Sequence, residues 1–355
     1  MRLKSDLGLM AKVVATYIGA VIGAGFASGQ EIMQFFIVFG PAGMWGVILA
    51  TILFAYLGAL IMFLAVRFRC TNYRELFNYL LGPAASKIMD GLSLLMLAGG
   101  LGVMLAGSGA VFSEQLGLPS WSGSVATAAL TCLVVTGSLQ GVLMANVILV
   151  PVKIVVIIFV TLAALFFHGT PSGPLPVEAP GPVVAGNWIW SAVLYVSYNM
   201  IVPVAVLSSL GRSITPMVAV WGGVWGGIGL GIAAGLITLA GLAFYPMVLL
   251  YEIPLLYIAG HLGEGIRIGL SVLIWLAILT TAIANAHGFA SRLAPELGVR
   301  YRIVGLAIVG ASFSLSGLDF SFLVSTIYPL FGYAGLILLA ALIMVPAYRW
   351  LRFYH

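Results

Sequence analysis

Residues 19–29 read GAVIGAGFASG and lie inside the first long apolar segment of the chain, residues 10–39. The segment is apolar enough to cross a bilayer, yet it carries glycine at positions 19, 23, 25 and 29. Each glycine costs roughly 1 kcal/mol relative to alanine inside a helix, so this cluster predicts a break. Irregular backbone within a membrane is tolerated only where protein or a watery cavity surrounds it. Because the free amide and carbonyl groups of a break can hold a substrate and an ion, the pattern favours a transporter.

The composition is that of an all-α integral membrane protein. Of the 355 residues, 62% are hydrophobic and 7% are charged, and the mean hydropathy is +1.16. A soluble domain is typically about 25% charged, so a soluble enzyme or scaffold is excluded. Cys70 and Cys132 form neither a disulfide framework nor a metal-binding pattern. The net charge of +5 does not indicate nucleic-acid binding, because the basic residues lie in short gaps between apolar runs.

The apolar runs predict ten transmembrane helices. Their approximate ranges are 9–39 (broken), 42–66, 88–113, 121–139, 143–168, 187–211 (broken), 215–243, 267–291, 301–317 and 319–347. Lysine and arginine gather in alternate gaps, and Arg267 is the one expected on the opposite side. By the positive-inside rule, both termini are then cytoplasmic. An alternative is a signal peptide cleaved after Gly29, which would remove one crossing and reverse this bias.

The chain is predicted to be a single membrane domain made of two inverted repeats, about 9–168 and 187–350. A gap rich in proline and glycine, residues 170–186, leaves five spans on each side. Because five is odd, the second half must enter the membrane from the opposite side, which is the topology of an inverted repeat. The first span of the second half is also expected to be broken, since residues 197–203 read SYNMIVP and proline disfavours helix. The alternative is that these glycines and prolines serve packing and kinks.

Two shorter segments complete the predicted architecture. Residues 72–81, NYRELFNYLL, are amphipathic and flanked by basic residues, which suits a helix along the cytoplasmic interface. Residues 251–261, YEIPLLYIAGH, are too interrupted to span and are expected to fold as an outer lid.

The two breaks supply the candidate substrate site. The half-helix after the first break is expected to present unpaired N–H groups that attract a carboxylate, and the aromatic rings of Phe26 and Tyr198 are candidates to cover an apolar side chain. Plain packing is the alternative for these rings. The predicted substrate-binding residues are Gly23, Ala24, Gly25, Phe26, Ala27, Ser28, Ser197, Tyr198 and Asn199.

Four further polar residues are candidates for ion coupling. Adjacent Thr280 and Thr281 offer hydroxyl oxygens to Na⁺ in an otherwise apolar span, although threonine often bonds its own helix. Lys153 lies about ten residues inside the fifth span, where a charge is costly. It must reach the interface, find oxygen partners or lose its proton. Glu31 follows the first break and is a candidate proton site or gate, with stabilisation of a helix start as the alternative.

The stretches GAVIGAGFASGQEIMQFF at 19–36, SYNM at 197–200 and TIYPLFGYAG at 326–335 resemble the YkvI-type bacterial membrane proteins. That group is similar to a branch of the amino acid–polyamine–organocation superfamily, which has the LeuT fold. The resemblance implies a five-plus-five inverted repeat with the substrate between broken helices one and six. It also implies multi-pass insertion in the bacterial cytoplasmic membrane.

The resemblance further implies a sodium site. Its carbonyl and hydroxyl ligands would come from Gly19, Ile22, Ala277, Thr280 and Thr281. In several members of the superfamily, a lysine of span five places its ammonium at the sodium position instead. Two cations cannot share that position at low dielectric, so either Lys153 points elsewhere or it is the cation.

The sequence therefore predicts a secondary transporter of a small carboxylate-bearing solute, an amino acid or related compound, by Na⁺-coupled symport. The alternatives are proton-coupled or ion-independent transport through Lys153, a channel, and a non-transporting sensor. No arrangement of catalytic residues is evident, so an enzyme is not expected. The expected partners are the solute and membrane lipid, with no nucleic acid and no cofactor besides the coupling Na⁺ or H⁺. The oligomeric state is open.

Overall fold

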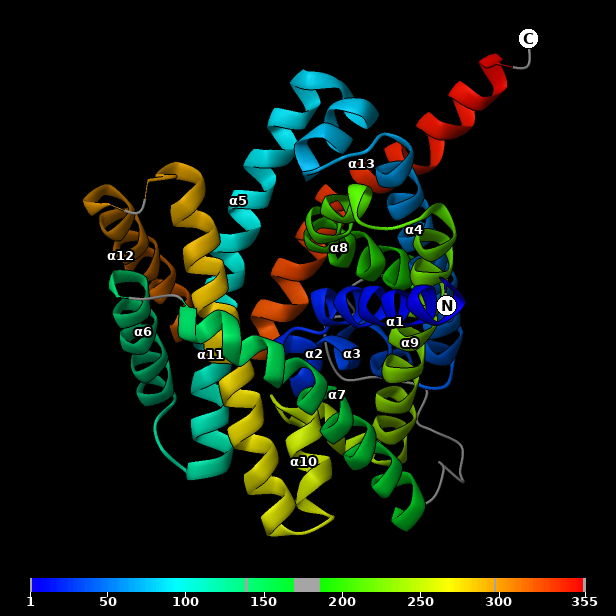
Figure 1. Cartoon of the computed structure of the whole chain (residues 1–355). Coiled ribbons are helices and arrows are strands. Elements are labelled where there is room, and N and C mark those ends of the chain that lie inside the picture. The colour runs from blue at the N-terminus through cyan, green and yellow to red at the C-terminus, as the bar shows by residue number, and fades with distance from the viewer. Residues whose placement is uncertain (1, 138–139, 169–185, 297, 354–355) are drawn as a thin grey trace.

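The computed structural model describes residues 2–137, 140–168, 186–296 and 298–353, whose regular elements are all helices (Figure 1). The first predicted span consists of three pieces, α1 (Arg2–Val21), α2 (Ala24–Ser28) and α3 (Gln30–Phe35). A two-residue gap separates α1 from α2, and Gly29, with φ +81°, separates α2 from α3. The break predicted from the glycine cluster is therefore present.

The other helices follow the predicted spans in order. They are α4 (Ala42–Arg67), α5 (Tyr73–Leu116), α6 (Ser120–Thr136), α7 (Gln140–His168), α8 (Trp188–Ser209), α9 (Pro216–Ala243), α10 (Pro254–Gly260), α11 (Glu264–Leu293), α12 (Val299–Phe313) and α13 (Phe320–Phe353), with short 3₁₀ turns at 37–39, 210–212, 247–250 and 314–317. All but the last residue of the predicted gap 170–186 lies outside the described residues, as do the last two residues of the predicted span 121–139.

Within the described residues, eight helices are long and apolar enough to cross a membrane. Three shorter apolar helices, Leu7–Val21, Gln30–Phe39 and Ser120–Thr136, fall in the first and fourth predicted spans. The all-helical membrane architecture is thus confirmed, and the count of ten spans stays a prediction.

The predicted break in the sixth span is wrong, because α8 runs without interruption through Pro203. The polar side chains expected to compete with helical pairing are bonded in ways that leave the helix intact. Ser197 Oγ donates to the carbonyl of Gly332 at 2.8 Å, and Asn199 Nδ2 donates to its own helix at Tyr195 O, 3.1 Å away. Proline is tolerated in a helix whose neighbours stabilise the freed backbone. Only one of the two first spans is therefore divided in this structure.

The predicted interfacial helix of residues 72–81 forms the start of α5. Asn72 caps it by accepting a hydrogen bond from the Glu75 amide at 3.1 Å. It ends at Gly82, whose φ of +77° and ψ of 168° bend the chain before the long part of α5, which contains the candidate membrane span Ser86–Leu116. Left-handed backbone of this kind favours glycine, so Gly82 followed by Pro83 makes the bend.

The predicted lid contains the short helix α10, which has seven residues and cannot span a bilayer. Glu252, just before it, accepts hydrogen bonds from the Phe320 amide at 2.8 Å and from Ser321 Oγ at 3.3 Å. Its own amide donates to Glu114 Oε1 at 2.6 Å. Burial raises the pKa of Glu252 above 4.5, with Asp319 adding to the rise. These contacts join the segment before α10 to the end of α5 and the start of α13.

The helices form two packed groups. One contains α1, α4, α8 and α9, and the other contains α5, α6, α11 and α12, with α13 contacting both α8 and α5 (Figure 1). Close approach of α4 and α9 depends on small residues, because a Cβ on Gly223 would overlap the backbone of Ala59 and one on Gly227 would overlap that of Ala55. Small residues let transmembrane helices pack backbone to backbone.

Candidate functional site

The gap between α1 and α2 lies inside the bundle. Ile22 and every residue of α2 are buried. The backbone there is only partly paired in helical fashion: the Gly23 amide turns back to the carbonyl of Val21 at 2.8 Å, and Ala27 bonds to Gly23 at 3.1 Å. α2 is a single turn, so its dipole is weaker than that of the half-helix expected from the sequence.

Lys153 on α7 points into the bundle towards this gap. Its side chain is 3% exposed, and its Nζ lies 3.4 Å from the carbonyl oxygen of Ile22. One turn earlier on both helices, a Cβ on Gly19 would lie 2.9 Å from Val150 Cγ1, so α1 and α7 approach closely here. Among the described residues, no carboxylate forms an ion pair with Lys153. Its ammonium therefore contacts the carbonyl of Ile22. The resemblance implied that this carbonyl, together with that of Gly19, would bind sodium.

The threonine pair on α11 is bonded to its own helix. Thr280 Oγ1 donates to the carbonyl of Ala277 at 3.1 Å, and Thr281 Oγ1 donates to the same oxygen at 2.7 Å. That carbonyl thereby accepts two hydrogen bonds, while each hydroxyl oxygen keeps lone pairs. α11 packs against both α2 and α7, the helices that contribute to the gap and Lys153.

Glu31, on the first turn of α3, folds back against α2. Its side chain is 5% exposed, and its Oε2 accepts a hydrogen bond of 2.5 Å from Tyr198 Oη on α8. The other oxygen, Oε1, faces Gly25, where a Cβ would overlap it. Glycine at position 25 thus leaves the space that the carboxylate occupies. Glu31, which follows the first break in sequence, thus places its carboxylate beside Gly25 of α2.

The remaining predicted substrate residues have varied surroundings. Ser28 Oγ donates to the carbonyl of Gly25 at 2.8 Å and accepts from the Gln30 amide at 3.2 Å, so it stabilises the turn. Phe26 is buried. Ser197 bonds to α13 and Asn199 to its own helix, as described above. Of the three candidates from the second predicted break, only Tyr198 is joined by a hydrogen bond to the first span.

Three further residues of this region were not singled out from the sequence as binding residues. Tyr195 and Tyr328 flank Tyr198, with ring centroids 5.7 and 5.0 Å from it. Gln30 is fully buried, and within the described part of the chain neither Nε2 nor Oε1 of its side chain has a hydrogen-bond partner, nor does the hydroxyl of Tyr195. The spacing of Tyr195 and Tyr198, three residues apart on one helix, is a usable signal for a shared face.

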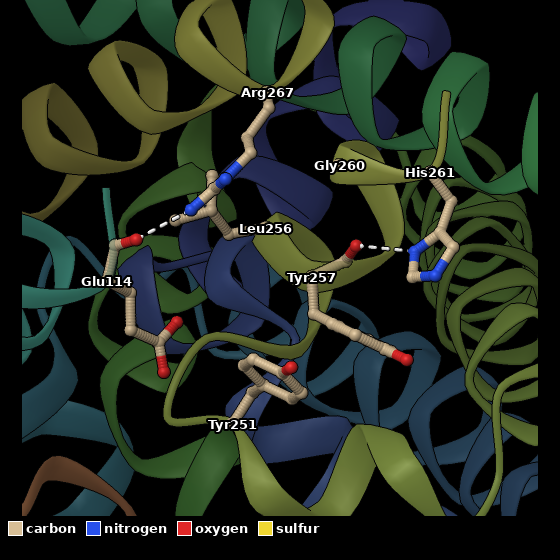
Figure 2. Close-up of a pocket in the computed structure, with 7 residues that line it drawn as sticks. All are labelled: Glu114, Tyr251, Leu256, Tyr257, Gly260, His261 and Arg267. Atoms are coloured by element: carbon tan, nitrogen blue, oxygen red, sulfur yellow. Dashed lines mark hydrogen bonds between the residues drawn. The ribbon is translucent and has the colours of Figure 1, made fainter. Parts of the chain in front are cut away.

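A pocket of about 360 Å³ lies beside α10, away from the α1–α2 gap (Figure 2). Tyr251 and Tyr257 stack with centroids 4.1 Å apart, and Arg267 Nη2 donates to the carbonyl of Glu114 at 2.6 Å. His261 Nδ1 lies 3.1 Å from the carbonyl of Tyr257. None of the predicted site residues lines this pocket, whose full lining is Glu114, Tyr251, Leu256, Tyr257, Gly260, His261 and Arg267.

Solved structures share the architecture. The inward-facing conformation of Mhp1 aligns with a TM-score of 0.58 at 16% identity, over 88% of this chain and 72% of that one. Mhp1 is a transporter of the nucleobase-cation-symport-1 family, and its closed conformation with bromovinylhydantoin bound aligns with a TM-score of 0.52 at 15% identity, over 92% of this chain and 70% of that one. A manganese transporter of Eremococcus coleocola gives 0.55 at 15% identity over 96% and 79%. The chain is therefore an all-helical membrane protein with the LeuT fold, which these solved transporters share.

Sequence comparison identifies the family. The chain is 30% identical to the uncharacterized membrane protein YkvI of Bacillus subtilis, over 98% of this chain and 99% of that protein. It is 28% identical to YyaD of the same organism, over 93% and 94%. The chain therefore belongs to the YkvI family of membrane proteins. No protein-family model matches it.

Proposed function

We propose that the chain is a secondary active transporter of a small amino-acid-like solute, working by alternating access. The fold that it shares with solved transporters and the divided first span, with buried polar groups at the break, support this proposal. In this mechanism the solute binds at the α1–α2 gap. It shifts the balance between outward-open and inward-open states by binding them with different affinity.

The observation that carries the coupling mechanism is the contact between Lys153 Nζ and the carbonyl of Ile22. A resident ammonium supplies the positive charge that Na⁺ would otherwise bring, and two like charges a few ångströms apart repel strongly at low dielectric. We therefore propose proton-coupled or ion-independent transport, with Lys153 and Glu31 as the groups that can exchange protons.

Na⁺-coupled symport is the second candidate. The hydroxyl oxygens of Thr280 and Thr281 favour it, because α11 packs on α2 and both hydroxyls retain acceptor capacity. The cation would then be held by the ligand set Gly19, Ile22, Ala277, Thr280 and Thr281. This arrangement requires Lys153 to move away from Ile22.

The resemblance to a manganese transporter does not extend to a carboxylate-rich metal site. Within the described residues, no three histidine, cysteine, aspartate or glutamate side chains come together as a metal site. An organic solute fits the buried aromatic and amide groups of the break better than a divalent cation does. The proposed membrane is the bacterial cytoplasmic membrane, with both termini on the cytoplasmic side.

Uptake into proteoliposomes tests the proposal. The purified full chain is reconstituted, and uptake of radiolabelled L-amino acids is measured with an inward proton gradient, with an inward Na⁺ gradient, and with neither. Saturable uptake that is unaffected by Na⁺ supports the Lys153 mechanism. Uptake that requires Na⁺ supports the second candidate, and no uptake under any gradient contradicts transport. Single-channel currents in a planar bilayer would instead indicate a channel.

A further inference from the structure

Glu31 is a buried carboxylate without a basic partner. It is 5% exposed, and no lysine, arginine or histidine among the described residues lies within ion-pairing distance of it. A single phenolic hydroxyl, that of Tyr198, contacts one of its two oxygens. An ionised carboxylate buried in this way is costly unless a positive charge or a proton reaches it. The site therefore requires a mobile partner for Glu31.

The surroundings of Glu31 suit an organic cation. Tyr198 packs against Tyr328, Tyr195 and Phe35, at centroid distances of 5.0, 5.7 and 5.6 Å. Aromatic faces attract ammonium groups through the ring quadrupole, and the attraction is strongest where water is excluded. The second oxygen of Glu31 lies beside Gly25, at the α1–α2 break, and no hydrogen bond from a described residue reaches it. This oxygen is the one available to a ligand.

Unpaired polar atoms on α3 and α8, the helices that carry Glu31 and Tyr198, also point to a ligand. The side chain of Gln30 is fully buried, and among the described residues its Nε2 and Oε1 have no hydrogen-bond partner, nor does the hydroxyl of Tyr195. Nearly all buried polar side-chain atoms in proteins have partners, so orphans of this kind need an explanation. A polar molecule bound between α3 and α8 would supply the hydrogen bonds that no described residue makes to these atoms.

We propose that Glu31, with the rings of Tyr198, Tyr195 and Tyr328, binds a basic nitrogen of the transported solute. The inference rests on the proposed function and narrows its substrate class. Lys153 contacts Ile22 and Glu31 contacts Gly25, three residues further along, whose Cα atoms are at most about 11 Å apart. The amino group of Lys153 and the carboxyl group of Glu31 thus lie near opposite ends of one short stretch of backbone. They match a zwitterion, with its carboxylate towards Lys153 and its ammonium towards Glu31, and they reject a carboxylate that has no nitrogen.

Matched ligands test this assignment on the purified full chain. Each L-amino acid is compared with the carboxylate that lacks its α-amino group, for example leucine with 4-methylpentanoate and phenylalanine with 3-phenylpropanoate. Thermal stabilisation in detergent at constant pH reports binding, because a ligand of the folded state raises the unfolding temperature. We expect stabilisation by amino acids and none by the deaminated partners. Liposome uptake of the same pairs should follow the same order.

Variants separate ammonium recognition from proton transfer. Glu31→Gln keeps the shape but removes the charge, and it should weaken amino-acid binding by more than about tenfold. Glu31→Asp should retain the preference for amino ligands, and Glu296→Gln, an exposed carboxylate elsewhere, should bind like the parent chain.

The inference is overturned in either of two ways: if deaminated carboxylates bind as well as amino acids, or if Glu31→Gln binds amino acids normally and alters only the pH dependence of uptake. Both results would leave the proposed transport intact. The absence of binding and uptake for every pair would contradict the proposed function itself.

Discussion

The ammonium nitrogen of Lys153 on α7 lies 3.4 Å from the carbonyl oxygen of Ile22, in the two-residue gap between α1 and α2. This contact joins residues 131 positions apart and brings a cation to the interrupted backbone. Whether that cation moves a proton, or only occupies the place of an ion, decides how transport is energised.

Lys153→Gln removes the charge and shortens the side chain by one atom, while leaving a polar group near Ile22. We expect uptake to lose its response to a proton gradient, because no ammonium remains at the gap. Uptake into liposomes at several external pH values measures this effect. Lys153→Arg, which keeps a permanent charge, should also lose the proton response but retain ligand binding in detergent. A Lys153→Gln protein with the pH profile of the parent would exclude proton transfer at this position.

Thr281→Ala should have a small effect if Lys153 supplies the cation. The hydroxyl donates to its own helix at Ala277, and such a bond contributes about 1 kcal/mol. We expect a similarly small fall in stability and unchanged uptake in the presence or absence of Na⁺. Thermal unfolding with and without NaCl, at constant ionic strength, measures the stability, and liposome uptake measures the transport. Sodium stabilisation of the parent that Thr281→Ala abolishes would favour the Na⁺ alternative.

Gly25→Ala should destabilise the site. The added Cβ would overlap Glu31 Oε1, so the carboxylate must leave its position against Tyr198. Overpacking of this kind typically costs about 1–3 kcal/mol, which thermal unfolding should detect. Gly23→Ala is the matched control for stability, because nothing lies within 4 Å of a Cβ built there. Equal unfolding temperatures for the two variants would show that the Glu31 carboxylate does not lie against Gly25 in solution.

Gly223→Ala should separate α4 from α9. Its Cβ would overlap the backbone of Ala59, and backbone cannot rotate aside as a side chain can. We expect a loss of about 1–3 kcal/mol in stability. Gly235→Ala on the same helix has its nearest neighbour, Val47 Cγ1, at 3.8 Å, so it should be neutral or slightly stabilising. The two unfolding temperatures, measured in the same detergent, give the comparison.

Glu252 should make stability depend on pH. Burial raises the pKa of its carboxyl group above 4.5 in the folded chain, so the folded state holds the proton more tightly than the unfolded state. Stability should therefore fall as the pH rises from about 4.5 through the raised pKa. Glu252→Gln should flatten this part of the profile, while Glu296→Gln should not. A steeper profile in Glu252→Gln would contradict this assignment.

The sequence was sufficient for the membrane class, the order of the helices and the break in the first span, because glycine and hydropathy act locally. It was misleading for the sixth span. There, the effect of Pro203 depends on what its neighbours bond to, and the hydroxyl of Ser197 is taken up by Gly332 on α13.

The residues of the candidate site could be predicted only in part, for a similar reason. Glu31 and Tyr198 were each singled out, but their contact joins residues 167 positions apart. The roles of Tyr195 and Gln30 depend on what surrounds them after folding, which no local pattern shows. The pair Thr280 and Thr281 could be recognised in the sequence as a motif. The sequence did not show that both hydroxyl groups donate to the carbonyl of Ala277.

The intact α8 has a mechanical consequence. The first span is divided at Gly23 and Gly29, where backbone torsions can change at little cost, whereas α8 is continuous and is joined to α13 by the hydrogen bond from Ser197 to Gly332. We therefore expect conformational change to concentrate at these two glycines, with α8 as the fixed surface against which α1 and α3 pack.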